Sequence, residues 1–170
     1  MNKKLDVQKL SAQYIVRELK QEEAAIVYDL CKENPLFYRY HPPFVTAESI
    51  LEDMKALPPH KDYKDKYYIG FFQHSQLAAV MDLIADYPQK STAWIGFFAV
   101  NIRCQKRGVG TGIISDCAAC LKLLGFEKIR LGIDKGNPQS RAFWTKNHFV
   151  LTEGEISAGE TAYCMMERRL

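Results

Sequence analysis

The sequence lacks any apolar run long enough to span a membrane. Its longest runs, such as residues 94–100 (WIGFFAV), are far shorter than the ~20 residues that a membrane-spanning helix requires. No apolar signal core follows the basic start MNKKLDVQKL, so no secretory leader is expected. Low-complexity tracts and internal repeats are also missing. We therefore expect one domain over residues 1–170, located in the cytoplasm.

The chain also lacks a strong excess of one charge. It has 23 Lys and Arg against 20 Asp and Glu, a formal net charge of +3. An excess this small does not indicate nucleic-acid binding, and acidic residues accompany most of the basic ones. We expect neither nucleic acid nor a membrane as partner, whereas a homodimer remains open.

Paired metal-binding motifs are missing as well. The five cysteines are an odd number without a secretory signal, which favours free thiols in a reducing compartment. Cys117 and Cys120 form a CxxC, which suggests zinc or redox chemistry, but no second CxxC exists and the four histidines are scattered. Because the pair falls in an apolar helical stripe, buried structural cysteines are favoured and no metal is expected.

Periodicity and turn residues predict a mixed α/β fold. Three helices are expected around residues 22–33, 46–57 and 109–124, with Thr46 as an N-cap and Gly125 ending the third. Asn137 followed by Pro138 predicts a fourth helix to residue 147. The prolines of residues 34–44 are read as a break between the first two helices. Strands are expected at 14–20, 66–72, 77–88, 92–101, 128–133, 149–154 and 163–170.

Residues 100–114 (VNIRCQKRGVGTGII) combine three basic residues with three glycines between apolar ends. Such a strand–loop–helix favours anion binding at the helix N-terminus. The spacing disfavours a Walker A loop and nucleoside-triphosphate binding, because no lysine follows the glycines in the required frame. A dinucleotide fingerprint would need glycine where Ile113 stands, with Asp134 as the ribose-binding acid, and it would usually open the domain.

The loop CQKRGVGTG has the form Gln-x-x-Gly-x-Gly and resembles the acetyl-CoA pyrophosphate loop of the GNAT superfamily of acyl-CoA-dependent N-acyltransferases. The stretch IRLGIDKGNPQSRAFWTKNHF resembles the second motif of that family. Both motifs occur in order, and the order of elements extends the likeness over nearly the whole chain. The resemblance implies a central twisted, mostly antiparallel sheet with splayed middle strands, flanked by about four helices.

The resemblance also implies acetyl-CoA as cosubstrate and a set of residues that hold it. The pantetheine arm would pair with Phe98, Ala99 and Val100, where one N–H would stabilise the oxyanion. Asn137 would bond the pantetheine or phosphate region, or simply cap its helix. The pyrophosphate loop would comprise Gln105, Lys106, Arg107, Gly108, Val109, Gly110 and Thr111, and the adenosine side Ser140, Phe143 and Lys146. Gly112 is then read as a helix-packing position, and Arg103 as a surface charge.

The chain departs from the family pattern at its acid and base. Trp144 stands where many members carry a tyrosine acid, and an indole N–H does not deliver a proton. The thiolate, with a pKa of about 8.5, then leaves unaided, or Tyr163 serves as the acid. His148 replaces the usual glycine of the second motif and is read as a structural substitution.

The central strand TAWIGFFAV carries no acid, so Asp82 is the candidate general base. Its apolar neighbours should raise its pKa. Alternation puts Met81 and Leu83 on the opposite face, which favours an outward-facing Asp82 instead. Proton removal by water is a further alternative.

These observations predict transfer of acetyl from acetyl-CoA to a primary amine by direct attack in a ternary complex, without a covalent enzyme intermediate. The acceptor, a small molecule or a peptide amine, is not specified by the sequence. Aromatic residues between the first two helices are expected either to shape its pocket or to pack the helices: Phe37, Tyr38, Tyr40, His41 and Phe44. The alternative is a CoA-binding module that senses or scaffolds without turnover.

Overall fold

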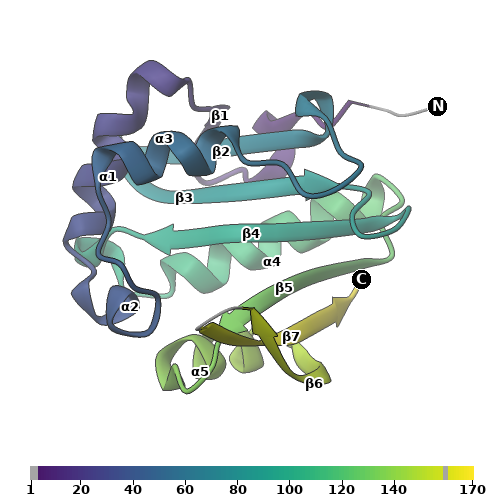
Figure 1. Ribbon diagram of the computed structural model, residues 1–170. Coiled ribbons are helices and arrows are strands. Elements are labelled where there is room, and N and C mark those ends of the chain that lie inside the picture. The colour runs from purple at the N-terminus through teal and green to yellow at the C-terminus, as the bar shows by residue number, and fades with distance from the viewer. Residues whose placement is uncertain (1–3, 159–160) are drawn as a thin grey trace.

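The computed structural model describes residues 4–158 and 161–170, and within them the strands form one seven-stranded sheet (Figure 1). The sheet order is β1-β2-β3-β4-β5-β7-β6. Among the strands that the structure describes, β4 and β5 are parallel and the other neighbouring pairs are antiparallel. The mostly antiparallel mixed sheet is therefore confirmed. The strands are β1 (Ile15–Glu18), β2 (Lys66–Gln73), β3 (Gln76–Ala85), β4 (Thr92–Val100), β5 (Lys128–Asp134), β6 (Val150–Ala158) and β7 (Thr161–Arg169).

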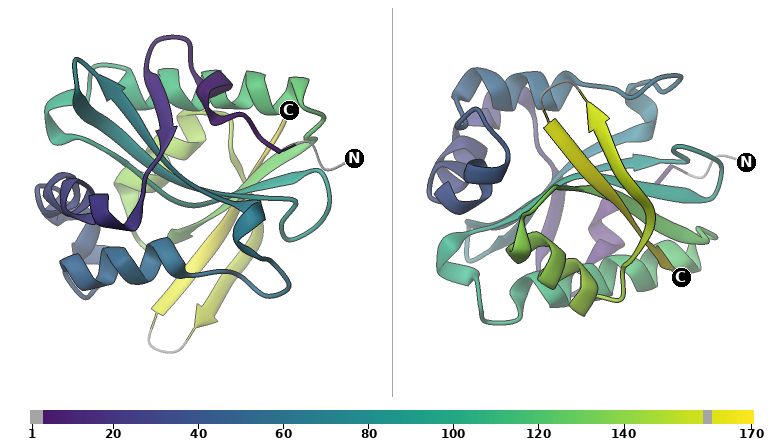
Figure 2. Two further views of the ribbon diagram at one scale, coloured as in Figure 1. Left: turned by 90° about the horizontal axis from the view of Figure 1, so that it is seen from above. Right: turned by 60° about the horizontal axis from the view of Figure 1, so that its bottom comes forward.

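Helices cover both faces of the sheet (Figure 2). One face carries α1 (Ala24–Lys32) and α3 (Ala47–Lys55), which pack in one apolar cluster. The other carries α4 (Val109–Leu123) and α5 (Pro138–Lys146), which pack in a second. Within the described residues, no helix is long and apolar enough to cross a membrane. Short 3₁₀ helices cover Val7–Leu10, Gln21–Glu23, Tyr63–Asp65 and Ile102–Cys104.

The predicted helix after the glycine run is confirmed. Its apolar stripe buries Ile113, Cys117 and Leu121 against the sheet. Gly125 follows the helix with a φ of +89°, a left-handed conformation that glycine adopts without strain. Burial in this core raises the pKa of the Cys117 thiol, which agrees with a structural cysteine. Among the described residues, no group of three or more His, Cys, Asp or Glu side chains is arranged to hold a metal ion.

The prediction of a proline-broken loop between the first two helices is wrong, because residues Pro35–Tyr40 form a further helix, α2. Pro35 stands at its first position, where a helix has no use for the missing N–H and benefits from the fixed φ. The helix ends before the Pro42–Pro43 pair. The proline thus starts a helix rather than preventing one.

The middle of the sheet is split, because β4 and β5 pair over only part of their length. Residues 92–95 pair with 128–131, and beyond them the two strands separate (Figure 1). A β-bulge lies at the same point: Asp82 pairs with Phe97 and Leu83 with Ile95, which leaves Gly96 without a partner on β3. A bulge bends its strand and increases the local twist, so it directs the end of β4 away from β5. A Cβ at Gly96 would lie 3.0 Å from Asp82 Oδ2, so the close approach of backbone and carboxylate leaves little room for a side chain.

Gly112 is not the packing position that the sequence suggested. A Cβ at Gly112 would meet no atom within 4 Å, whereas one at Gly110 would lie 3.0 Å from Phe143 Cε2 and 3.2 Å from Val100 Cγ2. The close contact of α4 with its neighbours is therefore made by Gly110.

Gly112→Ala is expected to stabilise the protein by about 0.5–1 kcal/mol, because alanine loses less conformational entropy in a helix than glycine. Gly110→Ala should not show this gain, since its methyl group would press on the Phe143 ring. Denaturant unfolding of both variants measures the two effects. Equal stabilisation by both variants would contradict the assigned packing.

Candidate active site

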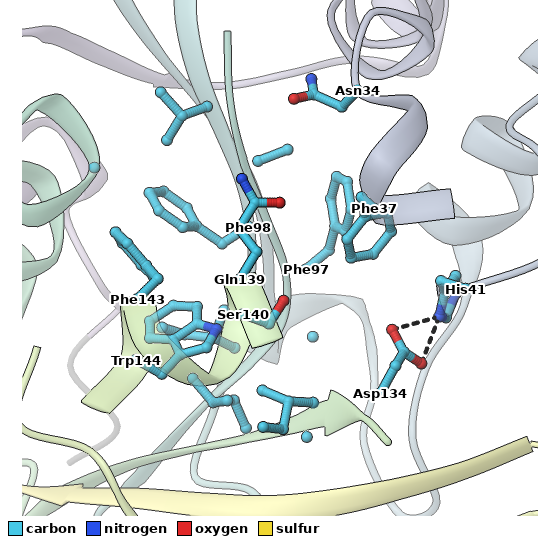
Figure 3. Close-up of a pocket in the computed structure, with 18 of the residues that line it drawn as sticks. Asn34, Phe37, His41, Phe97, Phe98, Asp134, Gln139, Ser140, Phe143 and Trp144 are labelled. Atoms are coloured by element: carbon cyan, nitrogen blue, oxygen red, sulfur yellow. Dashed lines mark hydrogen bonds and ion pairs between the residues drawn. The ribbon is translucent and has the colours of Figure 1, made fainter. Parts of the chain in front are cut away.

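A cavity of about 1150 Å³ opens where β4 and β5 separate. Its floor is formed by the ends of both strands, and residues of α4 and α5 line one side. Figure 3 shows Phe143 and Trp144 of α5 facing Phe37 of α2 and His41 across this space. Residues that lie far apart in the sequence therefore face one space. The loop and the second motif singled out by the sequence both reach this cavity.

The N-terminus of α4 opens onto the cavity with free amide groups. Gly108, at the N-cap, has a φ of +78° and accepts the first intrahelical hydrogen bond from the Gly112 N–H. The N–H groups of Val109, Gly110 and Thr111 consequently have no acceptor within the helix. No side chain caps this end, whereas Thr46 caps α3 and Asn137 caps α5. Three outward amides at the positive end of a helix form a cradle for an anion.

The loop residues before α4 have different placements. Lys106, like residues 108–111, lines the cavity, and its backbone is left-handed with a φ of +58°. Arg107 is exposed and does not line the cavity. The side chain of Gln105 also reaches the cavity, but its Nε2 donates to Val100 O at 2.9 Å and to Asn34 Oδ1. Gln105 therefore ties the end of β4 to the start of α2.

The second motif supplies the opposite wall through α5. Ser140, Phe143 and Lys146 line the cavity, as does Gln139, whose amide extends into it (Figure 3). Asn137 is only 2% exposed and does not line the cavity. Its Oδ1 accepts from the Ser140 N–H at 3.1 Å, so the capping role is the one the geometry supports.

Trp144 is part of an aromatic cluster rather than a proton donor. It is 8% exposed, and its ring centroid lies 4.9 Å from that of Phe143, 5.0 Å from Phe149 and 5.9 Å from Phe98. The cluster joins α5 to β4 and to the start of the last hairpin. Trp144 therefore stabilises the cavity wall. It does not replace the tyrosine acid that the resemblance would place at this position.

The end of β4 presents an unpaired edge to the cavity. Phe98, Ala99 and Val100 line the cavity and bond β3 on one side, while β5 has already separated on the other. An unpaired strand edge can accept an extended chain as an additional strand.

The predicted aromatic residues divide into two groups. Phe37, Tyr38 and His41 line the cavity from α2 and its C-cap, while Tyr40 and Phe44 do not. The Phe37 ring lies 5.9 Å from that of Phe97 on β4, edge to face. The α2 side of the cavity is thus an aromatic wall, built by the helix that the sequence did not reveal.

Asp82 lies on the face opposite Met81 and Leu83, as alternation predicted, and it lines the cavity, but its side chain is largely buried. Its carboxylate accepts two hydrogen bonds from Lys66 Nζ, at 2.8 and 2.9 Å. The two side chains are only 14% and 4% exposed. Burial raises the pKa of Asp82 and the Lys66 ammonium lowers it. An ion pair of this kind disfavours Asp82 as the group that takes a proton.

Tyr163 lies on β7 and lines the cavity next to the split. Its ring covers Gly132 of β5, where a Cβ would lie 3.2 Å from Tyr163 Cδ2. Its ring therefore lies beside the split, and its role as acid stays a prediction. His148 is exposed and has a φ of +69°, a left-handed conformation that glycine adopts most easily. This agrees with a structural substitution of His148 for the glycine of the second motif.

The structure also pairs His41 with Asp134, which no sequence pattern indicated. His41 Nδ1 lies 3.0 Å and 3.2 Å from the two carboxylate oxygens of Asp134, across the cavity mouth (Figure 3). The Asp134 carboxylate raises the pKa of His41 above its ordinary value, while burial opposes this. The two residues are 93 positions apart, so only the fold brings them together.

The cavity combines a split in the sheet with an uncapped helix N-terminus, the two features that the resemblance of the sequence motifs implied. The model of the Acetyltransferase (GNAT) family matches residues 26–149, and the chain belongs to this family. The likeness of the two motifs to that family is thereby confirmed. No curated protein matches the sequence.

Solved structures agree on the fold. An acetyltransferase from Thermus thermophilus superposes with a TM-score of 0.72 at 18% identity, covering 91% of this chain and 96% of that one. A PaiA N-acetyltransferase from Thermoplasma acidophilum, in complex with coenzyme A, gives 0.67 at 16%, covering 91% and 98%. A spermidine N-acetyltransferase chimera from Vibrio cholerae and hSSAT gives 0.68 at 17%, covering 93% and 96%.

Proposed function

We propose that residues 1–170 act as one N-acetyltransferase unit that moves the acetyl group of acetyl-CoA to a primary amine. The observation that carries this proposal is the free edge of β4 next to the uncapped amides of α4. The free edge of β4 suits the extended, amide-bearing pantetheine arm, and the uncapped amides of α4 suit the pyrophosphate. Family membership supports the reaction class, and the neighbour in complex with coenzyme A supports the cosubstrate.

The residues present fit acetyl-CoA. The amides of Val109, Gly110 and Thr111 would hold the pyrophosphate, and Lys106 would add a charge-assisted bond. Gly108 suits this loop, because its φ of +78° is a left-handed conformation that glycine adopts without strain. Ser140, Phe143 and Lys146 would line the adenosine side. Gln105 would act indirectly, by fixing the end of β4.

The cosubstrate supplies an activated acetyl thioester, and the protein supplies position and polarity. The free edge at Phe98, Ala99 and Val100 would align the thioester and offer one N–H to the developing oxyanion. The amine would enter from the α2 side, between Phe37 and Phe97, and attack directly. Burial raises the pKa of Cys31, the cavity cysteine, to about 11, which does not suit a covalent nucleophile.

The five cysteines are free thiols in the described structure, and we place the protein in the cytoplasm on that basis. The acceptor is proposed only as a primary amine on a small molecule or a peptide.

The test is a thiol-release assay with acetyl-CoA over a panel of diamines, polyamines, amino sugars and peptides with free N-termini, with mass spectrometry of the amine product. Turnover with an acetylated product supports the proposal. If calorimetry shows CoA binding but no amine of the panel is acetylated, a sensor module is favoured. Trp144, at the position of the family's tyrosine acid, agrees with that alternative. Failure to bind CoA would contradict both.

A further inference from the structure

The cavity contains a histidine–carboxylate pair, His41 and Asp134, that has no role in the proposed binding of acetyl-CoA. His41 ends α2 and Asp134 ends β5, and both side chains line the cavity. Nδ1 of the imidazole faces both carboxylate oxygens, at 3.0 and 3.2 Å. The pair joins the aromatic wall of α2 to the split in the sheet, where the acceptor and the thioester would meet.

The contact at Nδ1 determines what the other ring nitrogen can do. An ionised carboxylate accepts the Nδ1–H, so the neutral ring carries its lone pair on Nε2. Nε2 has no hydrogen-bond partner among the described residues. The Phe37 ring lies 5.3 Å from the imidazole, tilted by 31°, and limits its rotation. An imidazole oriented through one nitrogen and free at the other has the arrangement of a general base.

We propose that His41 is the general base of the reaction, taking a proton from the acceptor's ammonium group through Nε2, with Asp134 as its positioning residue. This inference rests on the proposed function. Asp82, the other candidate for the general base, forms a largely buried ion pair with Lys66. The aromatic wall beside His41 would hold the carbon chain of the amine.

The charged groups around His41 suit this task. Asp134 faces it from β5, and Asp53 acts on it from α3. Both are negative, so they stabilise the imidazolium and raise the pKa of His41 from its ordinary value near 6.5. A base whose pKa lies near the working pH is best suited to proton transfer. The same carboxylates attract an acceptor that arrives as a cation.

The acceptor nitrogen loses two protons during the transfer. The ammonium loses one proton to His41 Nε2, which releases it to solvent. The amine lone pair then forms a bond to the thioester carbon, and the carbonyl electron pair moves onto oxygen. When that pair returns, the carbon–sulfur bond breaks, and the second proton lost by the nitrogen ends on the CoA sulfur. The products are the amide, free CoA and one proton.

The test compares His41→Gln and Asp134→Asn with the wild type, using the best amine of the panel. His41→Gln should lower kcat by about 100-fold or more while acetyl-CoA binding, measured by calorimetry, stays within 3-fold of the wild type. The wild-type kcat/KM should rise with pH through the ionisation of His41, and His41→Gln should lose that rise. Asp134→Asn should move it to lower pH, because the imidazolium loses its stabilising charge.

His74→Gln is the matched control, since His74 is exposed in the β2–β3 turn and should retain full activity. Wild-type turnover that survives in His41→Gln, with the same pH profile, would overturn the inference and leave the proposed function intact. An Asp134→Asn profile identical to the wild type would overturn the positioning role. A wild type that binds CoA but acetylates no amine would overturn both the proposed function and this inference.

Discussion

Gly108→Glu is expected to abolish CoA binding while the protein stays folded. Gly108 stands at the N-cap of α4, directly before the three uncapped amides. A side chain there meets no protein atom within 4 Å, so the glutamate would occupy open space and place a negative charge where the pyrophosphate would bind. Calorimetry with CoA measures the loss, expected to exceed about 100-fold in Kd, which corresponds to about 2.7 kcal/mol.

The left-handed backbone of Gly108 requires a control with the same strain. Gly125→Glu provides it, because Gly125 also has a positive φ, +89° against +78°, and also has no atom near its Cβ position. Both variants should lose about 1–2 kcal/mol of stability. Only Gly108→Glu should lose CoA binding. Unchanged CoA affinity in Gly108→Glu would show that the cradle is not the phosphate site.

Lys66→Met is expected to lower the free energy of unfolding by about 3–5 kcal/mol at pH 7, because it leaves the Asp82 carboxylate buried without its partner. Lys66 Nζ lies 2.8 Å from Asp82 Oδ2, and both side chains are largely buried. Denaturant unfolding measures the effect. The double variant Lys66→Met with Asp82→Leu should recover most of the loss, because it removes the charge together with its partner.

The destabilisation by Lys66→Met should also depend on pH. Burial already raises the pKa of Asp82, and removing the ammonium raises it further. A carboxyl with a higher pKa in the folded state binds more protons folded than unfolded, so stability falls as pH rises from the unfolded pKa to the folded one. The loss should therefore be smaller at pH 5 than at pH 7. A loss that is independent of pH, or a double variant no more stable than the single one, would contradict the buried ion pair.

Local patterns in the sequence were sufficient to predict most elements of the fold. The stripe that includes Ile113, Cys117 and Leu121 repeats every four residues, and it forms the buried face of α4. Thr46 and Asn137 precede their helices and cap them through side-chain hydrogen bonds. The glycine loop was predicted as an anion site from its spacing, and the structure gives it free amides. Each of these features depends on residues close together in the chain.

The missing features depend on residues that are distant in the chain. The bulge at Gly96 is defined by its register with β3, and a single strand does not reveal its register. The pairing of His41 with Asp134 needs α2, β5 and the sheet order together. Asp82 was read correctly as facing away from Met81, yet its partner Lys66 comes from the neighbouring strand. Proline both opens and interrupts helices, so the sequence around Pro35 predicts a break where the structure has α2.

The proposed mode of cosubstrate binding puts CoA in the gap between β4 and β5, with its pyrophosphate on the first turn of α4. Hydrogen exchange of the backbone amides, with and without saturating CoA, tests it most directly. We expect slower exchange at residues 109–111 and at alternate amides within residues 96–100, with no change in β1 or at the β2–β3 turn. CoA binding that leaves both segments unprotected, or no CoA binding at all, would contradict it.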